Sequence, residues 1–211
     1  MRGIEQVPWL YDPLVALLEA TGLGRWRGWL ARGARGRTLD LGCGTGRNLP
    51  LVPAGATAVG LDPCHASLLR ARRRAPGVAL VRGRAEMLPF RDRAFDTVVC
   101  GLVLCSVADP RRTLAEVRRV LGPGGRLRLL EHVRARRRPH ARLQDLAQPF
   151  WTWLTGGCHP NRDTEAAVEA CGFAIDPESR RARGLMRRFV AIPSSPGESP
   201  SSPAQNPAPP A

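Results

Sequence analysis

Residues 38–50, TLDLGCGTGRNLP, are the segment that says most about the fold of this chain. A short apolar run ends in Asp40, and glycines follow at alternate positions, Gly42, Gly44 and Gly46. Glycine has no Cβ and adopts positive φ, so such a segment can turn sharply and let a ligand approach the backbone closely. The pattern predicts a strand that leads into a ligand-binding turn.

The spacing of these glycines bears on the ligand. A dinucleotide fingerprint requires a glycine three positions after Gly44, and that position holds Arg47. An acid before G-x-G-x-G suits instead an amino-acid moiety whose ammonium group lies near Asp40. A nicotinamide oxidoreductase is therefore disfavoured.

A second acid ends the next predicted strand. Val59-Gly60-Leu61 leads to Asp62, a carboxylate placed to accept both hydroxyls of a ribose. An ammonium partner followed by a ribose partner fits S-adenosylmethionine, and a later Pro123-Gly124-Gly125 turn agrees with the same order. Each feature alone also fits an ordinary strand-to-helix turn or a helix cap.

The chain alternates between strand and helix patterns. We expect strands at residues 38–41, 57–61, 78–82, 94–100 and 126–133, and helices near residues 46–52, 65–74, 110–121 and 163–172. This rhythm predicts an α/β fold, with a Rossmann-like, doubly wound, mostly parallel sheet flanked by helices in a single domain.

The predicted organisation has three parts. Residues 1–36 form an N-terminal helical cap, in which Asp12-Pro13 starts a helix with aspartate as its cap. Residues 37–192 form the domain, with a lid-like insertion at residues 134–165, and residues 193–211 form a disordered Pro/Ser/Ala tail. Trp26 and Trp29, which lie among arginines, pack either on the core or on an anionic membrane surface.

The net charge of +14 would ordinarily suggest a nucleic-acid partner. All 32 basic residues are arginine, however, and they are spread along the chain, which indicates a compositional bias rather than a binding patch. The three densest runs, at residues 70–74, 134–138 and 180–188, are expected to be solvated helix faces or connectors. Nucleic acid is accordingly disfavoured as a partner.

The six cysteines form no C-x-x-C pair and no zinc-ligand spacing, and the four histidines add none, so the sequence predicts free thiols, a reducing cytoplasmic location and no metal requirement. The first residues lack the apolar region of a signal peptide, and no run of about 18 apolar residues occurs. Membrane attachment, if present, is expected to be peripheral.

The chain resembles class I S-adenosylmethionine-dependent methyltransferases of the ubiquinone/menaquinone-methyltransferase-like type over residues 7–190. The motifs that carry this resemblance are, in order, DLGCGTGRN, GLDP, AEMLPF, FDTVV, LAEVRRVLGPGG and LLEHV. Three segments are more similar to the methyltransferase-like thiol methyltransferases and their bacterial relatives: VVCGLVLCSVADP, EHVRA and GGCHPNRDT.

The resemblance implies a cofactor, S-adenosyl-L-methionine, and a set of residues that bind it. These are Tyr11, Asp40, Gly42, Cys43, Gly44, Gly46, Asn48, Asp62, Pro63, Ala85, Glu86 and Leu102. One departure concerns Arg84, because many relatives have an acid there to meet the adenine amino group. That contact is expected to pass to the backbone or to Glu86.

The implied reaction is methyl transfer to a small-molecule acceptor by in-line displacement, in which alignment alone can contribute about 7 kcal/mol or more. A thiol acceptor needs little base assistance, since with a pKa of about 8.5 it is already partly ionised at neutral pH. His132 and His159 are the candidate general bases for other acceptors, each with an alternative structural role. Two further hypotheses remain: an arginine-rich nucleic-acid-associated methyltransferase, and a non-catalytic S-adenosylmethionine-binding protein.

Overall fold

The computed structural model describes residues 7–194 and contains one eight-stranded sheet. The strands lie in the order β3-β2-β1-β4-β5-β8-β6, with β7 paired to β8. Their bounds are β1 Arg37–Leu41, β2 Thr57–Asp62, β3 Ala79–Arg82, β4 Phe95–Gly101, β5 Leu121–His132, β6 Phe173–Ile175, β7 Arg181–Arg183 and β8 Met186–Pro193. Strands β1 to β5 are parallel, whereas β8 runs antiparallel to β5, β6 and β7. The predicted doubly wound, mostly parallel sheet is confirmed.

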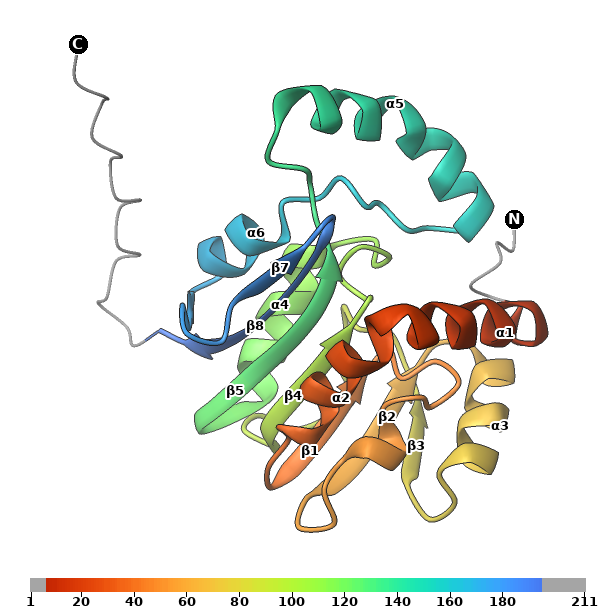
Figure 1. Cartoon of the computed structure of the whole chain (residues 1–211). Coiled ribbons are helices and arrows are strands. Elements are labelled where there is room, and N and C mark those ends of the chain that lie inside the picture. The colour runs from red at the N-terminus through yellow and green to blue at the C-terminus, as the bar shows by residue number, and fades with distance from the viewer. Residues whose placement is uncertain (1–6, 195–211) are drawn as a thin grey trace.

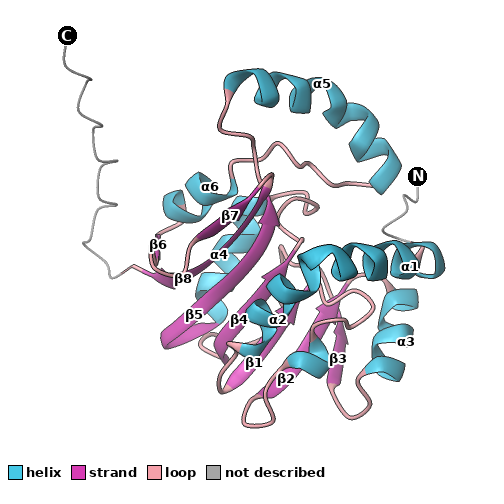
Figure 2. Cartoon of the chain, viewed as in Figure 1, coloured by secondary structure: helices cyan, strands magenta, loops and turns pink. Residues whose placement is uncertain are grey.

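Helices cover both faces of the sheet (Figures 1 and 2). Their bounds are α1 Pro8–Leu18, the π-helical turn Glu19–Leu23, α2 Gly24–Arg32, the 3-10 turn Leu49–Leu51, α3 His65–Arg74, α4 Pro110–Val120, α5 Arg138–Thr155 and α6 Thr164–Ala170. The main core joins α4 and α6 to one face of the central strands. On the opposite face, α2 packs against β4 and β5, and α3 packs against β2 and β3.

The alternation of side chains along each strand explains these two layers. In β4, Val98 and Cys100 point into the core under α4, while Val99 between them contacts the residues of α2. Both faces are apolar because both are covered by helices, as parallel sheets require.

Trp26 and Trp29, on α2, pack against the core cluster between α2 and the sheet. Of the two alternatives, packing on the core rather than on a membrane surface is therefore correct. The guanidinium of Arg128 lies 4.3 Å from the centre of the Trp29 ring and donates a 2.8 Å hydrogen bond to the carbonyl of Leu30. Arg188 covers the same ring at 4.6 Å. Burial lowers the pKa of Arg128 to about 10. The two arginines therefore pack against the tryptophan face of α2 rather than extending into solvent.

Three local predictions were wrong, and one helix was not predicted. The helix expected at residues 46–52 is only the 3-10 turn Leu49–Leu51, because the glycine-rich turn occupies the residues before it. Asp12 does not cap a helix, since α1 begins at Pro8 and carries Asp12 in its interior. The arginine run at residues 180–188 is neither helix nor connector, because it forms β7 and enters β8. Within the predicted lid-like insertion, residues 138–155 form the 18-residue helix α5 with Pro149 inside it, a helix that was not predicted.

Helices α1 and α5 lie at the end of the sheet where the parallel strands finish (Figure 1). Ligands of open α/β sheets bind at this carboxyl edge. The predicted tail lies outside the described residues from residue 195 onward, and Pro193 still belongs to β8.

Candidate active site

The turn after β1 has the backbone that its three glycines predict. Gly42, Gly44 and Gly46 have φ values of 61°, 54° and 79°, in the left-handed region. A Cβ on Gly42 would meet Val103 at 2.6 Å, and one on Gly46 would meet Ala71 at 2.9 Å, so these two glycines allow close packing. A Cβ on Gly44 would meet nothing within 4 Å. Gly44 is therefore the glycine whose surface is open to a ligand.

Asp40 presents one unsatisfied oxygen at this turn. Its carboxylate is fully buried at the end of β1, and Oδ1 accepts a 2.8 Å hydrogen bond from Asn48, whose own Oδ1 accepts from Arg27 at 2.7 Å. Oδ2 has no hydrogen-bond partner within residues 7–194. Burial raises the pKa of Asp40 to about 7, and the nearby Asp62 adds to the rise. A ligand ammonium group would satisfy Oδ2 and stabilise the charged form.

Asp62 closes the glycine-rich turn onto β2. Its Oδ2 accepts from the backbone N–H of Gly44 at 2.9 Å, and its Oδ1 accepts from that of Cys64 at 2.8 Å. Burial raises the pKa of Asp62 despite these bonds. Cys43 is buried behind the turn, and the carbonyl of Pro63 accepts a hydrogen bond from Arg82. Each carboxylate oxygen of Asp62 retains a lone pair for a ribose hydroxyl.

The predicted adenine-binding residues follow β3. Ala85 is buried, and Glu86 accepts a 3.0 Å hydrogen bond from the N–H of Ala108. The Glu86 carboxylate also lies 3.5 Å from the Arg84 guanidinium. Glu86 thus links the segment after β3 to the segment after β4.

The segment after β4 depends on an acid that was not among the predicted site residues. Leu102 has a φ of 62°, rare for a residue with a side chain, and its N–H donates to the carbonyl of Leu130. The buried Glu131 carboxylate then accepts from the N–H groups of Val103 and Leu104 at 2.8 and 2.9 Å, and from Cys105 at 3.4 Å. Glu131 therefore fixes the conformation of this segment. The signal in the sequence was an acid at a strand end, as at Asp40 and Asp62.

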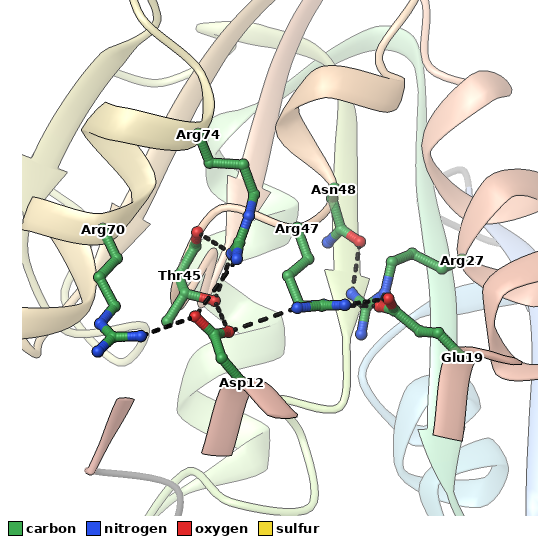
Figure 3. A network of polar contacts seen from close by, with 8 residues as sticks. All are labelled: Asp12, Glu19, Arg27, Thr45, Arg47, Asn48, Arg70 and Arg74. Carbon is green, nitrogen blue, oxygen red and sulfur yellow. Dashed lines mark hydrogen bonds and ion pairs between the residues drawn. The ribbon is translucent and has the colours of Figure 1, made fainter. Parts of the chain in front are cut away.

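A polar network joins α1 to the glycine-rich turn (Figure 3). The Asp12 carboxylate accepts a 2.6 Å hydrogen bond from Thr45, and it also pairs with Arg47, Arg70 and Arg74. Burial alone would raise the pKa of Asp12, but the hydrogen bond from Thr45 and the charge of Arg74 lower it overall. An acid expected to cap a helix instead holds α1 over the turn.

The second half of the network centres on Glu19. Its carboxylate pairs with Arg47 and, at 2.6 Å, with Arg27 (Figure 3). Arg27 also donates to Asn48, so the network reaches the buried Asp40. Tyr11 lies on α1, but its side chain is outside the part that the structure describes, so its predicted contact with the cofactor stays a prediction.

The two predicted catalytic histidines lie close to two cysteines. The sulfur of Cys158 is 4.0 Å from Nδ1 of His132, at the end of β5. Cys105, His132 and Cys158 place their ligand atoms within 4.8 Å of one another. A hydrogen bond from the Cys105 thiol, helped by His132, lowers the pKa of Cys158, whereas the same bond and burial raise the pKa of Cys105.

His159 is tied to the same group through its backbone. Its N–H donates a 2.7 Å hydrogen bond to the carbonyl of Cys105, and its ring Nδ1 lies 2.7 Å from the carbonyl of Gly157. A carbonyl only accepts, so Nδ1 carries the proton and the neutral ring has its lone pair on Nε2. Nε2 is the atom of His159 that can accept a proton.

A cavity of about 350 Å³ lies beside this region, between the segment after β4 and the start of α6. Asp109, Arg111, Arg162 and Thr164 line part of it. None of the predicted cofactor or catalytic residues lines this cavity. We therefore assign neither the cofactor nor the acceptor to it.

The fold and the glycine-rich turn of this chain are similar to those of class I, S-adenosylmethionine-dependent methyltransferase domains. A family model described as a methyltransferase domain matches residues 39–129, which include the glycine-rich turn, Asp62 and most of β5. S-adenosyl-L-methionine is the cofactor of this class, and the open face of Gly44 beside the unsatisfied Asp40 oxygen fits it.

Three relatives illustrate the likeness. The thiol S-methyltransferase TMT1B of Rattus norvegicus is 38% identical over 144 residues, which cover 64% of this chain and 59% of the relative. The demethylmenaquinone methyltransferase of Renibacterium salmoninarum is 40% identical over 96 residues, or 45% of this chain and 40% of the relative. The crystal structure of an S-adenosylmethionine-dependent methyltransferase from Methanosarcina mazei has a TM-score of 0.60 and 26% identity, covering 76% of this chain and 93% of that one.

The match to TMT1B thus spans about three fifths of that relative's length. Within residues 7–194, no helix combines the length and the apolar character needed to cross a membrane.

Proposed function

We propose that this protein transfers a methyl group from S-adenosylmethionine to the sulfur of a small thiol. The observation that carries the proposal is the buried Asp40 oxygen without a partner, next to the open face of Gly44 at the carboxyl edge of the sheet. The thiol acceptor is suggested by the relatives named as thiol S-methyltransferases, at 35–38% identity.

Each of the proposed cofactor residues binds a different part of the cofactor. Asp40 takes the ammonium group, Asp62 takes the ribose hydroxyls, and the segment of Ala85 and Glu86 takes the adenine. Gly44 lets the cofactor lie against the backbone of the turn. Leu102 and the segment that Glu131 orders border the reacting end. The bound cofactor supplies an electrophilic methyl group on a sulfonium, which a nucleophile displaces in line.

The protein's own part is to orient the acceptor, exclude water and remove one proton. The acceptor sulfur forms its bond to the methyl carbon as the carbon–sulfonium bond breaks, so the products are a thioether and S-adenosylhomocysteine. The thiol proton leaves before or during this step. His159 Nε2 and His132 are the proposed proton acceptors, because both lie where β4 and β5 end.

Residues 134–165 are proposed to act as a lid over this acceptor site. The backbone bond from His159 to Cys105 joins the end of this segment to the segment after β4. Helix α5 lies beyond the end of β5 (Figure 1). Hydrogen exchange in α5 that slows when S-adenosylhomocysteine and a thiol bind together would support a lid, and unchanged exchange would contradict it.

The outer surface of α5 supports a second proposal, peripheral contact with a membrane. Leu143, Leu146, Phe150 and Trp153 recur at helical spacing and are 59–79% exposed, and exposed arginines precede them. Such a face, apolar with basic neighbours, suits the surface of an anionic bilayer. In flotation with anionic vesicles, Leu146→Ser should reduce binding. Leu69→Ser, on α3 with 50% exposure, is the matched control and should not.

The central test is calorimetric titration with S-adenosylmethionine and with S-adenosylhomocysteine, followed by an assay of S-adenosylhomocysteine production with a panel of alkyl thiols and phenols. Micromolar binding and turnover with thiols would support the proposal. Binding without turnover would favour a non-catalytic binding protein. Turnover only with RNA, with steep salt dependence, would favour the nucleic-acid hypothesis.

A further inference from the structure

Three side chains that are distant in the sequence meet at the carboxyl edge of the sheet. Cys105 comes from the segment after β4, His132 from the end of β5 and Cys158 from the segment after α5. Their ligand atoms lie within 4.8 Å of one another, and both cysteines are 1% exposed. Two thiols and an imidazole are the donors that zinc prefers. We propose that they form a zinc site with one open coordination position.

The distances suit zinc after a small contraction. Zinc–sulfur bonds of about 2.3 Å and zinc–nitrogen bonds of about 2.1 Å place tetrahedral ligand atoms roughly 3.6–3.8 Å apart. The sulfur of Cys158 is already 4.0 Å from Nδ1 of His132. The widest pair therefore has to approach by about 1 Å.

The backbone around both sulfurs is well fixed. The Cys105 N–H donates to the buried Glu131 carboxylate, and the Cys105 carbonyl accepts from His159. The Cys158 carbonyl accepts from Thr152 at 2.8 Å, and its N–H donates to Thr155 at 3.2 Å. A site whose ligands are held in this way loses little entropy when the metal binds.

The charges of the three ligands also match the charge of a zinc ion. Two thiolates and a neutral imidazole offset the two positive charges of the ion, so the site is neutral before an acceptor thiolate binds. A neutral group is tolerated in this interior, where an isolated charge would be costly.

The number of ligands points to an open position. Structural zinc sites have four protein ligands, whereas sites with three retain an exchangeable fourth. Within residues 7–194, no fourth histidine, cysteine or acid joins the group. Resting on the proposed function, we infer that the fourth position takes the acceptor sulfur. Coordination ionises the thiol, and its proton passes to solvent, so in the zinc-loaded protein His132 is a ligand and no longer a proton acceptor. The site thus departs from the sequence-based prediction that no metal is required.

Cobalt provides a spectroscopic test of the whole protein. The chain is purified with a phosphine reductant, stripped with chelator and titrated with Co²⁺ without oxygen. One equivalent should produce thiolate-to-cobalt charge-transfer bands and intense visible bands of tetrahedral coordination. Zinc should abolish them, and a small alkyl thiol should shift them. Absence of thiolate bands in the unmodified protein would overturn the site, and bands that ignore the thiol would overturn the open position.

Variants identify the ligands. Cys158→Ser and His132→Gln should each weaken zinc binding by at least about 100-fold in competition with a chelating dye, since even outer contacts cost 10–100-fold. Cys171→Ser, a half-buried cysteine outside the group, is the matched control and should bind as the unmodified chain does. Circular dichroism and S-adenosylmethionine binding check folding. Equal zinc binding by Cys158→Ser and the unmodified chain would contradict the assignment.

The same material separates this inference from the proposed function. If the protein binds S-adenosylmethionine and methylates thiols but binds no metal, the zinc site is contradicted and the proposed function is not. If the protein shows the thiolate bands but methylates no thiol, the proposed reaction is contradicted and the metal site is not.

Discussion

Replacing Gly44 by alanine should separate two roles that glycine can have in a turn. Gly44 has a φ of 54°, and its missing Cβ would enter open space. In the free protein the substitution therefore costs only backbone strain, about 1 kcal/mol. When the cofactor binds, the added methyl group lies between it and the turn.

Gly77 is a matched control for this experiment. It also has a positive φ, 89°, and a Cβ there would likewise meet nothing within 4 Å, but it lies between α3 and β3, away from the glycine-rich turn. Gly77→Ala therefore introduces similar strain at a site without ligand. Both variants should lower the melting temperature by about 2–4 °C, the shift that 1 kcal/mol produces in a domain of this size.

Only Gly44→Ala should weaken cofactor binding. Loss of one close contact and displacement of the cofactor should cost about 1.4 kcal/mol or more, or at least tenfold in Kd. Calorimetric titration of both variants with S-adenosylhomocysteine measures this difference. Equal affinity of Gly44→Ala, Gly77→Ala and the unmodified protein would refute the placement of the cofactor over Gly44.

Four further outcomes are expected. Burial raises the pKa of Asp40 to about 7, so the charged form that binds the ammonium group becomes scarcer below pH 7. As the pH increases towards 7, the affinity for S-adenosylmethionine should therefore increase about tenfold per pH unit, and above pH 7 it should be constant. Calorimetry of Asp40→Asn should show an affinity that does not change with pH. The same raised pKa means that the folded protein without cofactor favours the protonated Asp40 carboxyl. Asp40 therefore contributes to the stability of the fold below about pH 4, and this contribution is lost as the pH rises through 7. Urea unfolding at several pH values, with Asp40→Asn as the reference, measures the loss. Asp62→Ala should weaken cofactor binding by about 1–3 kcal/mol, and an unchanged Kd would exclude a ribose contact. Glu131→Ala leaves three N–H groups unpaired and should lower the free energy of unfolding by about 3 kcal/mol. Glu131→Gln should restore part of this loss. Equal urea midpoints for the two variants would contradict the positioning role of Glu131.

Much of the fold could be predicted because its signals are local. The order of strands and helices from β1 to α4 follows from apolar runs, the glycine turn and the Asp109-Pro110 start of α4, where the Asp109 side chain caps the helix as its sequence suggests. Asp163 caps α6 in the same way, by accepting from Ala166. Helix α5 was not predicted because Pro149 lies inside it, and a proline ordinarily indicates that a helix ends or breaks.

The glycine-rich turn, the two acids at strand ends and the parallel α/β order could be read from the chain alone, because each depends on residues within a few positions of one another. The contacts that those residues make depend on how distant segments fold together. Asp12 binds the turn rather than a helix end because α1 folds back across it. Cys105, His132 and Cys158 converge because β4 and β5 are neighbours in the sheet and the segment after α5 returns to their ends. Contacts between segments this far apart leave no spacing in the sequence, so they exist only once the sheet has formed.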